Sequence, residues 1–94
     1  MLTFDLKNKD QVVYCLSQLK RFTKYFKDGN TDKMLQFGYT LGILQQLCNT
    51  PEKRIFWQPI ENFIINQYWQ SLDIYIDGLK ERFMIEYDIN ILAK

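Results

Sequence analysis

Apolar residues recur every three or four positions over residues 8–28, a spacing that predicts an amphipathic helix. The apolar stripe consists of Val12, Leu16, Leu19, Phe22 and Phe26, with Cys15 beside it. Asn8 is suited to cap the helix start, with Gln11 three residues later in a variant of the capping box. At the other end, Gly29 can take the left-handed conformation that ends a helix.

The same spacing predicts a second helix over residues 31–48. Its stripe consists of Met34, Phe37, Leu41, Leu44 and Cys48. The short connection makes the two helices antiparallel neighbours. Gly38 and Gly42 lie inside the second helix, where each costs up to about 1 kcal/mol relative to Ala. That cost indicates that another backbone or a large ring packs closely there.

Two prolines divide the next segment. Thr50 is placed to cap a helix with Pro51 at its first position, which predicts a short helix over residues 51–57. Pro59 has no backbone N–H and cannot lie inside that helix, so it ends the helix and begins a new one.

The last third of the chain carries two competing patterns. A helical spacing joins Ile65, Trp69, Leu72, Ile76, Leu79 and Phe83. A strict alternation over residues 83–91 is typical of a strand, and Asp77-Gly78 is a favoured two-residue hairpin turn. We expect a mostly α fold, a small antiparallel bundle of about four helices in one domain over residues 1–94. The alternative is an α+β fold with a small sheet formed by residues 2–6 and a C-terminal hairpin.

Composition adds a surplus of bulky residues. The 94 residues include 15 aromatic side chains and one alanine, Ala93. A chain of this size buries only about 60–65% of the surface it exposes when unfolded, so some aromatic side chains must reach the surface. Exposed Tyr and Trp are enriched at protein interfaces.

Several classes of chemistry lack their usual residues. The chain has no histidine, no glycine-rich phosphate loop and no C-x-x-C motif. We therefore expect a protein that is not an enzyme and that uses no cofactor or metal. Cys15 and Cys48 both lie on apolar stripes and are expected to be buried, reduced thiols. The sequence after Met1 has no basic or long apolar segment, which predicts a cytoplasmic protein without a membrane span.

Acidic and aromatic side chains in the last third form a predicted partner-binding surface. The candidate residues are Asp73, Asp77, Glu81, Glu86, Asp88, Trp69 and Tyr75. Three of these acids are spaced by four residues and fall on one side of a helix. Residues 72–92 carry a net charge of −3, which suits a basic protein partner.

A basic face on the first helix provides an alternative. Lys20, Lys24 and Lys27 lie away from the apolar stripe and could contact phosphates. The formal net charge of the chain is only +1, so no large field attracts a polyanion and a nucleic-acid partner is not favoured.

In size, aromatic surplus and acidic face, the chain is similar to small cytosolic proteins that neutralise a partner by binding it, such as the immunity proteins of bacterial toxin systems. This similarity is one of general class and involves no motif. It implies an inhibitor that occludes a basic protein, for example a nuclease toxin, and that is a monomer or weak homodimer. The alternatives are a small nucleic-acid-associated protein and a helical adaptor or dimerisation module.

Overall fold

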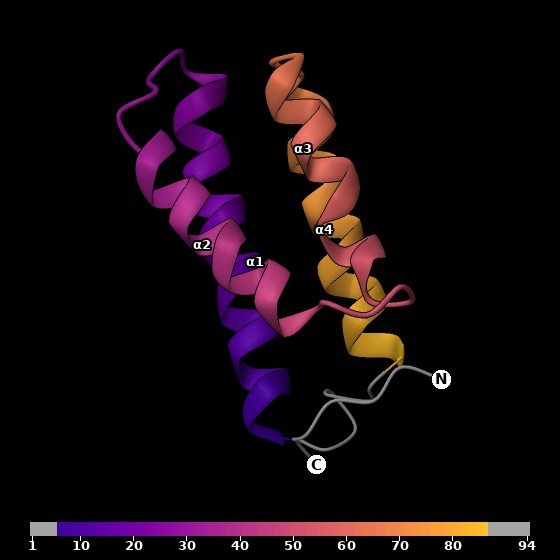
Figure 1. Ribbon diagram of the computed structural model, residues 1–94. Helices are drawn as coiled ribbons and strands as arrows, with labels where there is room; N and C mark the ends of the chain where they lie inside the picture. The colour runs from indigo at the N-terminus through magenta and orange to yellow at the C-terminus, as the bar shows by residue number, and fades with distance from the viewer. Residues whose placement is uncertain (1–5, 87–94) are drawn as a thin grey trace.

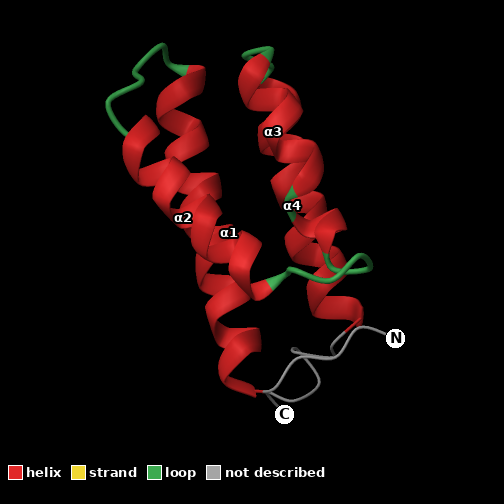
Figure 2. Ribbon diagram, viewed as in Figure 1, coloured by secondary structure: helices red, strands yellow, loops and turns green. Residues whose placement is uncertain are grey.

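The computed structural model describes residues 6–86, and every regular element in that range is helical (Figure 2). The four α-helices are α1 (Leu6–Lys27), α2 (Met34–Leu47), α3 (Gln58–Ile65) and α4 (Trp69–Glu86). A single 3₁₀ turn, η1 (Arg54–Phe56), precedes α3. The expected mostly helical bundle is confirmed.

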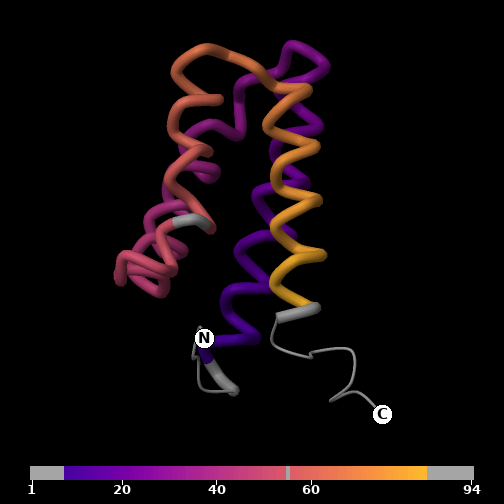
Figure 3. Tube along the Cα trace, turned by 90° about the vertical axis from the view of Figure 1, so that its right-hand side faces the viewer, coloured from indigo at the N-terminus to yellow at the C-terminus, as the bar shows by residue number. Residues whose placement is uncertain are grey.

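The helices run alternately up and down (Figure 1). The antiparallel pair α1 and α2 forms an N-terminal hairpin, and α3 and α4 form a C-terminal hairpin. The longest helices, α1 and α4, lie side by side and join the two hairpins, as the rotated view also shows (Figure 3). The turns that close both hairpins lie at one end of the bundle, and the connection between the hairpins lies at the other.

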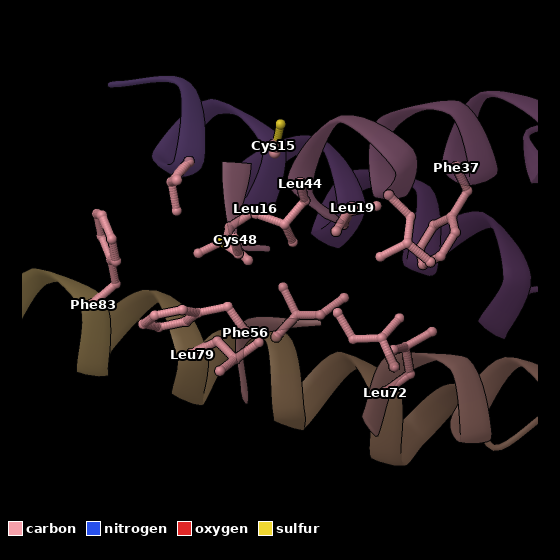
Figure 4. Packing of buried hydrophobic residues seen from close by; sticks show 14 of the residues in the cluster. Cys15, Leu16, Leu19, Phe37, Leu44, Cys48, Phe56, Leu72, Leu79 and Phe83 are labelled. Atoms are coloured by element: carbon pink, nitrogen blue, oxygen red, sulfur yellow. The ribbon is translucent and has the colours of Figure 1, made fainter. Parts of the chain in front are cut away.

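The core lies between the hairpins and contains most of the residues that the helical spacing selects (Figure 4). The fully buried side chains include Val12, Leu16, Leu19, Phe26, Phe37, Leu44, Phe56, Ile60, Leu72, Ile76 and Phe83. Phe26 joins the two hairpins, because its ring centroid lies 5.3 Å from that of Phe37 and 5.0 Å from that of Trp69. Towards the opposite end, the rings of Phe56 and Phe83 meet edge to face at 5.5 Å.

Both cysteines are buried, as predicted, and both are free thiols. Burial raises the pKa of Cys48 to about 12, an effect that Lys53 partly opposes. Burial raises the pKa of Cys15 as well. Because the thiolate is the nucleophilic form, neither cysteine is suited to react at neutral pH.

The end of α1 is closed by a Schellman motif, as the position of Gly29 predicts. The N–H of Asn30 donates to the carbonyl of Tyr25 at 2.9 Å, and the N–H of Gly29 donates to the carbonyl of Phe26 at 3.0 Å. Gly29 has a φ of +86°, which glycine adopts without a Cβ penalty.

The end of α3 has the same backbone geometry without a glycine. The N–H of Tyr68 donates to the carbonyl of Phe63 at 2.9 Å, and that of Gln67 donates to Ile64 at 3.1 Å. Gln67 has a φ of +56°, unusual for a residue with a side chain. This turn separates α3 from α4, so Ile65, placed on the predicted stripe, is instead 77% exposed.

Two predicted helix caps are wrong. Asn8 cannot be the cap of α1, because the helix already begins at Leu6 and a cap residue precedes the first helical residue. The expected helix over residues 51–57 is reduced to η1, and the buried hydroxyl of Thr50 has no hydrogen-bond partner. The backbone carbonyl of Thr50 instead accepts the N–H groups of Lys53 and Arg54. The new helix expected near Pro59 is confirmed, since α3 begins at Gln58.

The C-terminal hairpin of the alternative fold is wrong, because α4 continues through Asp77 and Gly78. Helical spacing buries Leu72, Ile76, Leu79 and Phe83 together. A hairpin at this position would have placed Glu81 on the buried side, whereas the helix leaves it exposed. Residues 2–5 of the expected sheet, and residues 87–94, lie outside the described residues.

The close packing expected at Gly38 and Gly42 does not occur among the described residues of this chain. A Cβ built on either glycine would have no heavy atom of a neighbouring element within 4 Å. Both glycines therefore face open space on α2.

Candidate functional site

The predicted acidic and basic surfaces meet at the seam between α1 and α4. Lys27 Nζ lies 3.0 Å from Asp73 Oδ2 and donates a hydrogen bond to it. Lys20 Nζ lies 3.9 Å from Asp73 Oδ1 and forms an ion pair with Asp77. Much of the charge that suggested two separate binding surfaces is thus neutralised within the molecule.

These ion pairs have a structural role that fits their burial. The side chain of Asp73 is only 17% exposed, and each lysine is about a third exposed or less. Exposed ion pairs contribute about 0.2–1 kcal/mol each, because water and salt screen them. The network therefore orients α4 on α1 and adds modestly to a seam that apolar packing already holds.

The remaining residues of the predicted partner-binding surface do not form one continuous surface. Trp69 packs on Phe26, and Tyr75 packs on Phe63 at a centroid distance of 5.5 Å. Burial raises the pKa of Tyr75, and Arg82 partly opposes this shift. Asp73 faces α1 while Tyr75 faces α3, so they occupy opposite flanks of α4.

The outer members of both predicted sites are more accessible. Glu81 and Lys24 are exposed to solvent. Glu86 is the last residue of α4, and Asp88 lies outside the described residues. Among the described carboxylates of the predicted partner-binding surface, Glu81 therefore has an exposed side chain that takes no part in the α1–α4 ion pairs.

A different surface stands out on the outside of the N-terminal hairpin. The 14 residues of α2 include no Asp, Glu, Lys or Arg. On its solvent side Leu35 is 85% exposed and Tyr39 is 75% exposed, and Ile43 lies one turn further along. Tyr14 of α1, which is 64% exposed, lies beside them. We call this surface the outer α1–α2 face.

A shallow groove runs along the outer α1–α2 face between the two helices. Tyr14, Tyr39 and Thr40 line it in the middle, and Ile43 lies on one side of them. Arg21 and Lys33 lie towards the hairpin turn. No carboxylate is among the residues that line the groove. The groove is therefore apolar in its middle, with two cations at one end.

The spacing of apolar residues does not reveal this surface, because that spacing assigns apolar residues to the core. Leu35 and Tyr39 fall opposite the stripe of Phe37, Leu41 and Leu44, where polar residues are expected on a surface helix. The informative feature was present in the sequence: residues 34–47 contain no charge at all.

Within residues 6–86, no cluster of cysteine or carboxylate side chains is arranged to hold a metal ion. In the same range, no helix combines the length and apolar character that crossing a bilayer requires. Comparisons with protein-family models, characterised proteins and solved structures found no match.

Proposed function

We propose that the protein acts by binding another protein chain through the outer α1–α2 face rather than by catalysing a reaction. The observation that carries this proposal is the uncharged helix α2, with Leu35 and Tyr39 largely exposed. A helix at a protein surface ordinarily presents charged residues to water. Apolar side chains gathered on one exposed face are typical of interaction surfaces.

The residue types on the face also suit binding. Tyrosine offers a large apolar area and loses little conformational freedom on binding, and the face contains Tyr14 and Tyr39. Tyrosine and arginine are enriched among residues that dominate binding energy, and Arg21 lies at the edge of the groove. A groove between two helices permits one common mode of binding, in which a partner helix packs its apolar side against both.

The specific form of this function expected from the sequence is a cytoplasmic inhibitor that neutralises a basic toxin through carboxylates of α4. Glu81 is exposed and supports that form. Asp73 and Asp77 favour it less, because their charges are balanced by lysines of α1. The two forms of the proposal therefore differ in the surface that contacts the partner, which is the outer α1–α2 face in one and the carboxylates of α4 in the other.

Matched variants test which surface binds. The tagged protein is cross-linked in cells that also produce an untagged wild-type copy. Captured proteins, the untagged copy included, are separated by size and quantified by mass spectrometry for the wild type, Tyr39→Glu, Tyr68→Glu and Glu81→Gln. Tyr68 is the control, because it is 57% exposed and lies outside the face. We expect Tyr39→Glu to lower capture about tenfold or more while Tyr68→Glu leaves it unchanged. Equal capture by Tyr39→Glu and the wild type would refute the outer α1–α2 face, and loss only in Glu81→Gln would favour the toxin inhibitor.

A further inference from the structure

We infer that the partner of the outer α1–α2 face is a second copy of this chain, docked antiparallel about a two-fold axis. This inference rests on the proposed function, since it names the chain that the face binds. In a two-fold dimer the same patch meets itself, so a patch carrying net charge repels its copy. The absence of charge on α2 removes that repulsion from the middle of such an interface.

The charges on the outer side of α1 are arranged to match under a two-fold axis. Asp10 and Arg21 are both exposed, and no ion pair or hydrogen bond joins either to another described side chain. They are separated by eleven positions, which is about three helical turns or 16 Å along one side of α1. An antiparallel copy therefore brings Asp10 of one protomer opposite Arg21 of the other, and the reverse pair forms at the same time.

The apolar part of the face lies where that axis would pass. The midpoint between Asp10 and Arg21 falls between residues 15 and 16 of α1. The groove brings Tyr14 and Cys15 of α1 level with Tyr39 and Ile43 of α2. The exposed rings are therefore central and the two charges peripheral, the usual arrangement of an apolar interface core with a polar rim.

The shape of α2 is compatible with a close approach. Gly42 lies between Tyr39 and Ile43 in sequence, and a Cβ built on it would meet nothing within 4 Å. A second helix can therefore approach the α2 backbone there without displacing a side chain of this chain.

Sedimentation equilibrium over a range of protein concentrations tests the dimer. We expect reversible dimerisation of the wild type, and about a tenfold or larger loss of association in Tyr39→Glu. Tyr68→Glu provides the control and is expected to associate like the wild type. Equal far-ultraviolet circular dichroism spectra of the two variants show that the fold is intact, whereas the melting temperature rises with dimerisation itself. A wild-type chain that stays monomeric up to about millimolar concentration, the weak end of specific affinity, overturns the inference.

Charge exchange tests the antiparallel arrangement. Asp10→Arg and Arg21→Asp each place like charges opposite one another, so each variant alone should associate more weakly than the wild type. The double variant Asp10→Arg/Arg21→Asp restores opposite charges and should recover association. An equimolar mixture of the two single variants should form a heterodimer, because both facing pairs then attract. Weak association in both the double variant and the mixture overturns the arrangement.

The outcomes separate this inference from the proposed function. A wild-type monomer whose cellular partner still depends on Tyr39 refutes the second copy and leaves the function of the face standing. A dimer that is unaffected by Tyr39→Glu, with capture of other proteins also unaffected, refutes both.

Discussion

The two hairpins use the same turn and encode it differently. At the end of α1 the left-handed position is held by Gly29, and at the end of α3 it is held by Gln67. The hydrogen bonds are equivalent in the two turns. The same backbone geometry therefore forms with either residue, and the residue at the turn decides how much that geometry costs. The sequence predicts the first turn because glycine favours a left-handed conformation, and it does not predict the second turn because glutamine does not.

The largest effect is expected from a substitution that removes the contact between the two hairpins. Phe26 is fully buried against Phe37 of α2 and Trp69 of α4, so Phe26→Ala leaves a cavity where both hairpins meet. We expect the free energy of unfolding to fall by about 3–5 kcal/mol. Urea unfolding followed by far-ultraviolet circular dichroism measures this loss. A loss below about 1 kcal/mol, the typical value for an ordinary substitution, would show that the hairpins are joined elsewhere.

The next effect concerns the turn at Gly29, which ends α1. Gly29→Ala places a side chain at a φ of +86°, and we expect a loss of about 1–2 kcal/mol in the free energy of unfolding. Gly78→Ala is the matched control, because Gly78 lies inside α4 and a Cβ there meets nothing within 4 Å. The control should gain up to about 1 kcal/mol. Equal effects of the two substitutions in urea unfolding would mean that the conformation of Gly29 is not what stabilises the turn.

The smallest effect concerns the turn at Gln67, which ends α3, and here the substitution is expected to raise stability. Gln67→Gly relieves the positive φ of a residue with a Cβ, worth about 1–2 kcal/mol, but glycine loses about 0.5–1 kcal/mol more conformational entropy on folding. We therefore expect a net gain of about 0.5–1 kcal/mol in the free energy of unfolding. Gln70→Gly, in the first turn of α4, should instead lose stability by a similar amount, since glycine disfavours the helix. Thermal melting of both variants tests this expectation. A Gln67→Gly variant that is less stable than the wild type would contradict it.

The core of this fold could be predicted from the sequence because it depends on periodic spacing. Residues such as Leu16, Phe37 and Ile76 are buried as their stripes require. The boundary between α3 and α4 could not be predicted, since no glycine or proline marks Gln67 and apolar residues continue on both sides. The number of helices was right although the expected helix over residues 51–57 is only the turn η1.

The candidate surfaces were harder to predict because they depend on neighbours distant in sequence. Lys27 and Asp73 are 46 positions apart, and nothing local shows that they pair. The sequence therefore predicted an acidic surface and a basic surface as separate sites, whereas their side chains neutralise each other at the α1–α4 seam. The outer α1–α2 face depends on a different kind of information, namely which side of α2 remains uncovered after the bundle forms.

The seam between α1 and α4 also bears on the order in which the chain assembles. The turns over residues 28–33 and 66–68 are short, so each hairpin closes a small loop. Bringing the first helix against the last closes a much longer loop, and the entropy lost grows with loop length. Contacts between distant segments generally slow folding. We therefore expect docking of the two hairpins along this seam to be the slow step of folding, and we expect its lysines and aspartates to act on that docking rather than on formation of either hairpin.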